Sequence, residues 1–128
     1  MAEQKLARID VEKEDLLNDL IIDSIQDIKG KNIIKLDLRK LDDAPTDYFI
    51  ICEGDSNTQV KAISDNITKR IKEELEIKVL HTEGREGRRW ILLDYFDTIV
   101  HIFYRETRTF YNLEDLWSDA GITEYQNL

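Results

Sequence analysis

Cysteine and proline are almost absent from the sequence, since its 128 residues contain one of each, Cys52 and Pro45. A lone cysteine cannot form a disulfide within the chain, and the apolar run around it is typical of a buried, reduced thiol. Pro45 marks a turn, and we find no internal repeat, linker or low-complexity segment. The sequence therefore predicts one domain with one core, as is usual at this length.

Long apolar runs and positive charge are also scarce. The longest apolar runs span a few residues, far short of the roughly 20 that a transmembrane helix needs. The N-terminus has no apolar stretch of signal-peptide length. Acidic residues outnumber basic ones by 27 to 18, for a net charge of −9, which opposes non-specific attraction to nucleic acid. We expect a cytoplasmic protein with no membrane partner and with a basic binding partner.

The order of apolar patterns predicts an α/β fold. Helical spacing over residues 14–29 stops before Gly30, and Ser56 and Gln59 form a capping box that begins a second helix. A third helix is expected within residues 111–117. Alternating or continuous apolar runs predict five strands, over residues 32–38, 48–52, 77–80, 90–95 and 98–104. The second helix would connect parallel strands, so we predict a mixed five-stranded sheet with helices mainly on one face.

The last two predicted strands form a hairpin that is the candidate interface. If Phe96 and Asp97 make a two-residue turn, Tyr95 faces Thr98 and the hairpin has one aliphatic face and one mixed face. The mixed face comprises Trp90, Leu92, Asp94, Ile99, His101 and Phe103. Because a stable monomer seldom leaves so apolar a face in solvent, the mixed face is predicted to bind a partner. Phe96 weakens the turn prediction, because a bulky residue resists the positive φ that such turns require.

Two other functions are open from the residues alone. Residues 54–56, which are glycine, aspartate and serine, lie at a strand-to-helix junction that could hold a phosphate, as in a metal-dependent nucleotidyltransferase or another nucleotide-binding enzyme. Such an enzyme also needs paired aspartates on a following strand, and residues 77–80 contain none. Helix capping explains the junction without a ligand. Alternatively, the mixed face could pair with a second copy of the chain as a homodimer.

Six short motifs follow one another in a fixed order. They are Pro45-Thr46-Asp47-Tyr48-Phe49-Ile50-Ile51, Gly54-Asp55-Ser56, Glu83-Gly84, Trp90-Ile91-Leu92-Leu93-Asp94, Val100-His101-Ile102-Phe103 and Phe110-Tyr111-Asn112-Leu113-Glu114-Asp115-Leu116-Trp117. At these spacings they closely resemble the ribosomal silencing factor family, also called Iojap. On this resemblance, residues 1–12 are an N-terminal extension, 13–119 the family domain and 120–128 a C-terminal tail. Phe96 and Glu53 depart from the family, which usually has glycine and a small residue there.

The resemblance implies a role in translation. Members of the family repress translation when nutrients run low, by binding the large ribosomal subunit through its fourteenth protein and sterically blocking the small subunit. Their fold is similar to that of nucleotidyltransferases without the catalytic carboxylates, so we expect no enzymatic activity, cofactor or metal. By position, the strands beginning at Trp90 and Val100 would supply the contact face. Arg85, Arg88 and Arg89 form a secondary candidate for contact with ribosomal RNA.

Overall fold

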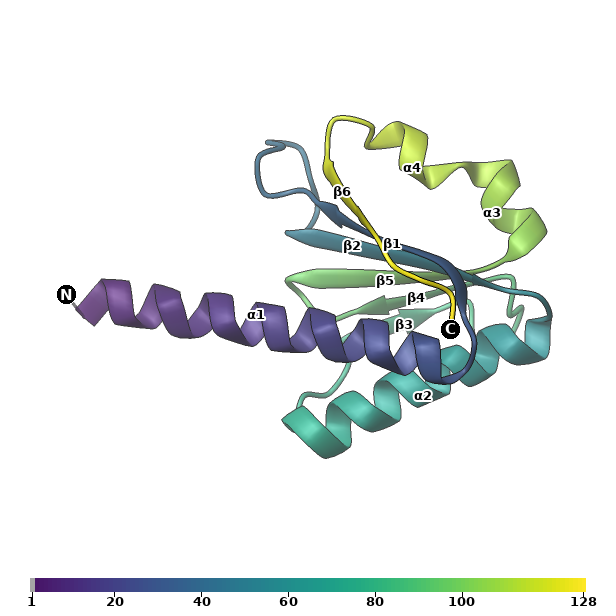
Figure 1. Cartoon of the computed structure of the whole chain (residues 1–128), viewed down its shortest axis with the longest axis horizontal. Helices are drawn as coiled ribbons and strands as arrows, with labels where there is room; N and C mark the ends of the chain where they lie inside the picture. Colours follow the sequence, from purple (N-terminus) through teal and green to yellow (C-terminus); the bar gives the residue numbers. More distant parts are fainter. Residues whose placement is uncertain (1) are drawn as a thin grey trace.

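Two long helices lie on one face of a mixed sheet, and two short helices lie on the other (Figure 1). This arrangement comes from a computed structural model that describes the backbone of residues 2–128 and the side chains of residues 13–128. The helices are α1 (Ala2–Asp27), α2 (Asn57–Leu75), α3 (Arg105–Tyr111) and α4 (Leu113–Leu116). The strands are β1 (Lys31–Asp37), β2 (Tyr48–Gly54), β3 (His81–Glu83), β4 (Trp90–Asp94), β5 (Thr98–Tyr104) and β6 (Gly121–Glu124). None of the described helices is long and apolar enough to span a membrane.

The sheet has the strand order β3-β4-β5-β2-β1-β6. β2 and β5 pair in parallel and the other neighbours pair antiparallel, which confirms the predicted mixed sheet. The predicted number of five strands is wrong by one, because β6 lies within residues 120–128, which we expected to be a tail. β6 adds to the edge of β1 through its backbone while all four of its residues stay exposed. It therefore lacks the apolar alternation from which a strand is predicted.

The connection through α2 differs in detail from the prediction. The third strand lies over β3 and not over residues 77–80. β3 runs parallel to β2, but β4 and β5 lie between them, so β2 pairs with β5 instead.

The single helix expected over residues 111–117 is replaced by two short helices, because Asn112 adopts a positive φ of 47° and separates α3 from α4.

The β4–β5 hairpin has the predicted register. Tyr95 N donates to Thr98 O at 2.9 Å, and Trp90 pairs with Phe103 at the far end. Phe96 adopts the positive φ of 76° that the turn requires, which is a strained conformation for a bulky residue. Asp97 N donates to Tyr95 O at 3.1 Å, which is the geometry of a γ-turn. The aliphatic and mixed faces of the hairpin are therefore separated as predicted.

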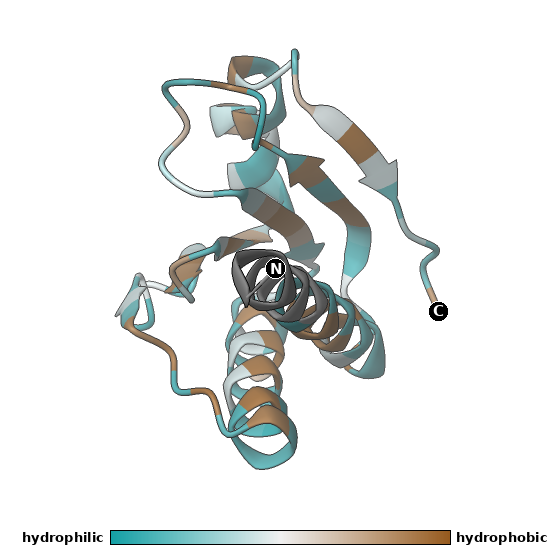
Figure 2. Ribbon diagram, turned by 90° about the vertical axis from the view of Figure 1, so that its left-hand side faces the viewer, coloured by the Kyte–Doolittle hydropathy of each residue, from teal (hydrophilic) through white to brown (hydrophobic). Residues whose placement is uncertain are grey.

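Apolar side chains form a core on each face of the sheet. The larger core lies under α1 and α2, which pack side by side on the same face (Figure 2). It includes Cys52, which is fully buried, and burial raises the pKa of its thiol to about 12. The smaller core is centred on Leu36, Phe49 and Phe103, and Leu113 and Trp117 from the segment after β5 pack over it. The two long helices and this segment thus cover opposite faces.

Arg108 fastens the segment after β5 to the sheet. Its guanidinium donates to Glu114 at 2.6 Å, to Glu53 on β2 at 3.1 Å and to the carbonyl oxygen of Asn32 at 2.5 Å. The Arg108 side chain is 11% exposed and the two carboxylates are 22% and 15% exposed. Since solvent screens these charges only partly, the cluster holds α3 and α4 against β1 and β2.

Removing the Arg108 charge should destabilise the fold. Arg108→Met keeps an apolar stem but leaves Glu53 and Glu114 close together without a cation, so we expect the free energy of unfolding to fall by about 2–3 kcal/mol. Urea denaturation, monitored by circular dichroism, measures the change in the free energy of unfolding.

Arg70→Met is the matched control, because Arg70 also contacts three carboxylates, on Asp23, Asp27 and Glu74, each about half exposed. Surface pairs of this kind contribute little, so the loss should stay below about 1 kcal/mol. Equal losses in the two variants would show that Arg108 has no special structural role.

Three carboxylates meet where α1 passes the start of β2. Glu14 on α1, Asp47 before β2 and Asp97 in the hairpin turn bring carboxylate oxygens within 4.8 Å of one another. Burial, a hydrogen bond with Asp47 and the charges of Asp47 and Asp97 raise the pKa of Glu14 to about 7, while Arg39 opposes the rise. In its protonated form Glu14 therefore links α1 to this end of the sheet.

This raised pKa makes stability depend on pH. The folded protein holds the Glu14 proton more tightly than the unfolded chain, so its stabilisation is complete below about pH 4.5 and is lost as pH rises through about 7. Glu14→Gln cannot ionise, so we expect it to match the parent near pH 4 and to exceed it at pH 8 by on the order of 1 kcal/mol after solvent screening. Denaturation at both pH values measures this difference. The control Glu73→Gln, at an exposed position on α2, should show no such pH-dependent gain, and an equal gain there would contradict the assignment.

Candidate docking surface

The six residues of the predicted mixed face all lie on the face of the sheet that α1 and α2 leave free. Four of them are half-buried, namely Trp90, Leu92, Asp94 and Ile99. His101 and Phe103 are buried instead, with 4% and 0% exposure. In the isolated chain these two side chains support the surface from below, and the half-buried residues are available to touch a partner. That any of the six contacts a partner stays a prediction.

Trp90 organises the buried part of this face. Its ring centroid lies 4.8 Å from that of Phe103 and 4.8 Å from that of Tyr111, and its indole Nε1 donates to Nδ1 of His101 at 3.0 Å. Because Nδ1 accepts, the imidazole proton is assigned to Nε2, which has no hydrogen-bond partner within residues 13–128. Burial lowers the pKa of His101 to about 4, so the ring is neutral at physiological pH. His101 therefore acts as a structural acceptor for the indole.

The part of this face over β3 and over β4 beyond Trp90 is uncovered. Pairing between these strands sets His81 beside Asp94 and Glu83 beside Leu92, and paired residues point to the same side of a sheet. We use the term docking surface for the open group formed by Glu83, Trp90, Leu92, Asp94 and Ile99. It combines apolar area with two carboxylates, which suits a basic partner with an apolar patch.

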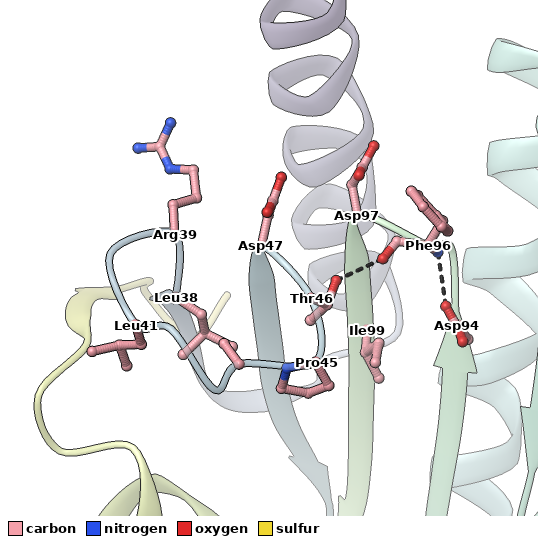
Figure 3. A pocket seen from close by; sticks show the side chains of 11 residues that line it. Leu38, Arg39, Leu41, Pro45, Thr46, Asp47, Asp94, Phe96, Asp97 and Ile99 are labelled. Carbon is pink, nitrogen blue, oxygen red and sulfur yellow. Dashed lines mark hydrogen bonds between the residues drawn. The ribbon is translucent and has the colours of Figure 1, made fainter.

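A hollow continues the docking surface past Ile99. Its walls are the loop between β1 and β2 and the turn of the β4–β5 hairpin (Figure 3). It is lined by Leu38, Arg39, Leu41, Ala44, Pro45, Thr46, Asp47, Asp94, Phe96, Asp97 and Ile99. Asp94 and Ile99 thus belong to both the surface and the hollow. The loop wall was not predicted from the sequence, although Pro45, Thr46 and Asp47 belong to one of the six motifs.

Aromatic side chains border the docking surface on the other side. Phe110 and Tyr111 are 81% and 51% exposed, and their rings meet edge to face at 5.1 Å. They line a second hollow with Arg89 and Trp90. The helical spacing of residues 111–117 predicted that Leu113, Leu116 and Trp117 pack on the core. Leu113 and Trp117 do so, but Leu116 is 74% exposed. Arg85 forms an ion pair with Asp65 at 2.7 Å, and a contact of the arginine group with RNA stays a prediction.

The geometry does not bring together the parts of a nucleotidyltransferase site. Ser56 Oγ accepts from Gln59 N at 3.1 Å, and Gln59 Oε1 accepts from Asp55 N at 2.7 Å, so the start of α2 is capped as predicted. The carboxylates of Glu14, Asp47 and Asp97 gather near the start of β2, whereas residues 54–56 are at its end. The seven-residue strand separates the two by roughly 20 Å. A single metal ion could not join a phosphate at one end to the carboxylates at the other.

Comparison with known proteins shows the family. The family described as "Ribosomal silencing factor during starvation" matches residues 11–128. The ribosomal silencing factor RsfS of Halalkalibacterium halodurans is 35% identical over 109 residues, which cover 85% of this chain and 92% of that protein. RsfS of Bacillus subtilis is 40% identical over 98 residues, covering 77% and 81%. A crystal structure of a protein from Chromobacterium violaceum is similar with a TM-score of 0.77 and 36% identity, covering 81% of this chain and 85% of that one.

The family match spans almost the whole chain, and the crystal structure has a similar fold. This confirms the resemblance on which the sequence analysis relied. The chain belongs to the ribosomal silencing factor family, and with that membership comes a ribosome-associated role in silencing translation.

Proposed function

We propose that the chain represses translation in the cytoplasm by binding the large ribosomal subunit through its fourteenth protein and sterically preventing the small subunit from joining. The repression would operate when nutrients are limiting. It has no chemical step, so it needs neither cofactor nor metal. Family membership supports the ribosomal role, and the docking surface supports a steric mechanism based on contact.

The observation that carries the proposal is the uneven cover of the sheet. Leu113 and Trp117 pack over the half of the free face near β1 and β2, while Leu92 and Ile99 stay partly exposed over β4 and β5. A partner could bury this apolar area without any change in the fold. Glu83 and Asp94 beside it would favour a basic partner, in keeping with the net charge of −9.

A charge placed within the docking surface should prevent binding. Leu92→Arg sets a cation in the middle of the surface, next to Glu83 on the neighbouring strand, so the fold is expected to tolerate it. Against a basic partner the new charge is repelled and apolar contact is lost, and we expect affinity for purified large subunits to fall at least about tenfold. Cosedimentation at several protein concentrations measures the affinity. The melting temperature checks that the variant is folded.

Leu16→Arg makes the same chemical change at a 57% exposed leucine on α1, on the helix side of the sheet. We expect this control to bind large subunits as the parent does and to block subunit joining equally well. If the parent chain does not sediment with large subunits, the proposed function is wrong. If Leu92→Arg binds normally while folded, the site is elsewhere.

A further inference from the structure

The hollow beside the docking surface has two walls that are held in place before any partner arrives. Thr46 Oγ1 donates to the carbonyl oxygen of Phe96 at 2.7 Å, which ties the loop to the hairpin turn (Figure 3). Tyr48 N donates to Asp97 O at 3.0 Å, and Leu38 N donates to Asp47 O at 2.8 Å. Because these bonds join the loop, the turn and the first residues of β2, the hollow is pre-organised.

The floor of the hollow is apolar and its rim is acidic. Leu38, Leu41, Pro45 and Ile99 supply hydrocarbon surface between the two walls (Figure 3). The lining also includes the carboxylates of Asp47, Asp94 and Asp97 and the guanidinium of Arg39. Asp47 and Asp97 extend away from Ile99 (Figure 3) and meet Glu14 of α1, so Asp94 is the carboxylate beside the apolar floor. A carboxylate at this place repels anions and attracts cations.

The one cation in the lining is already engaged. Arg39 donates to both carboxylate oxygens of Asp37, at 2.9 and 2.7 Å. In Figure 3 its side chain extends away from Ile99 and Asp94. Unlike the Arg39 guanidinium, the Asp94 carboxylate can still bind a ligand. Phe96 N donates to its Oδ1 at 2.7 Å, and the carboxylate can accept from a further donor.

The size of the hollow narrows the class of ligand. Its volume of about 330 Å³ is at the small end of the range for small-molecule sites, so it suits one extended side chain better than a cofactor. Lysine and arginine combine a hydrocarbon stem that can lie on apolar surface with a charged head that seeks carboxylates. Arginine adds a planar fork that can donate twice to one carboxylate.

We infer that this hollow receives a lysine or arginine side chain of the protein partner, with its stem along Leu41 and Ile99 and its charged head at Asp94. The inference rests on the proposed function, and it adds the chemistry by which the partner is recognised. Continuity with the docking surface through Asp94 and Ile99 places the hollow within reach of the same partner. The Asp94 carboxylate selects a cationic side chain over the apolar side chains that the floor alone would accept.

Asp94→Asn tests the inference at the carboxylate. The amide oxygen can still accept from Phe96 N, so the turn is kept while the charge is removed. We expect affinity for purified large subunits to fall about tenfold at low salt, and the remaining binding to depend less on salt concentration than in the parent. Asp119→Asn, which removes the same charge from an exposed residue after α4, should change neither quantity.

A second measurement uses small probes in place of the ribosome. In nuclear magnetic resonance titrations, butylguanidinium and butylammonium should shift the methyl signals of Leu41 and Ile99 in the parent chain, whereas butanol should not. The shifts should be lost in Asp94→Asn. Probe shifts that persist in the variant, or that spread evenly over the surface, would contradict the inference.

The two proposals fail in different ways. If Leu92→Arg abolishes subunit binding and Asp94→Asn leaves both affinity and salt dependence unchanged, the docking surface stands and the cation site is wrong. If the parent chain does not bind large subunits, the proposed function is wrong, whatever the probes show. A shift in the oligomeric state of the free chain caused by Asp94→Asn, measured by sedimentation equilibrium, would place a second copy in the hollow and also overturn the inference.

Discussion

Both long helices pack on one face of the sheet, and this arrangement leaves the other face to be covered by the short segment that follows β5. α1 and α2 completely bury the aliphatic face of the β4–β5 hairpin, as at Ile91 and Ile102. The opposite face receives α3 and α4, which Arg108 holds against β1 and β2. Because these two helices comprise seven and four residues, their cover reaches only the start of β4, where Tyr111 contacts Trp90, and leaves β3 and the rest of β4 open. The docking surface exists because the second layer is incomplete.

The elements that the sequence predicted well have signals that are local and periodic. The capping box at Ser56 involves residues three apart, and the hairpin register follows from two apolar strands separated by two residues. The period-two pattern then places Trp90, Leu92 and Asp94 on one face with their partners on β5. Phe96 was the weak point of that prediction. The neighbouring strands impose the turn, and Phe96 accepts a positive φ at a position where it is 72% exposed.

Features that depend on contacts distant in the sequence could not be predicted in this way. Residues 121–124 become a strand by pairing with β1, some 85 positions earlier, and no apolar pattern records that pairing. The burial of His101 and Phe103 depends on the segment after β5 folding back over the sheet. Likewise, the wall of the hollow is an irregular loop, whose place beside Ile99 follows from the parallel pairing of β2 with β5.

Acidic groups on this side of the molecule have a structural role near α1, and for Asp94 we propose a role in recognition. Glu14 meets Asp47 and Asp97 close to α1, where a shared hydrogen bond links helix and sheet. Asp94 lies on the docking surface and supports the hairpin turn through one oxygen. Asp94 thus both stabilises the hairpin turn and contributes negative charge to the open face. Much of the cost of concentrating negative charge is offset by protonation of Glu14 at neutral or lower pH.

A structure of the chain bound to the purified large ribosomal subunit, determined by electron cryomicroscopy, would show which face of the sheet the ribosome covers. We expect the open face over β3, β4 and the start of β5 to lie against a ribosomal protein, with α1 and α2 turned away from that protein. Contact made through α1 and α2, with the face over β3 and β4 left in solvent, would contradict this expectation.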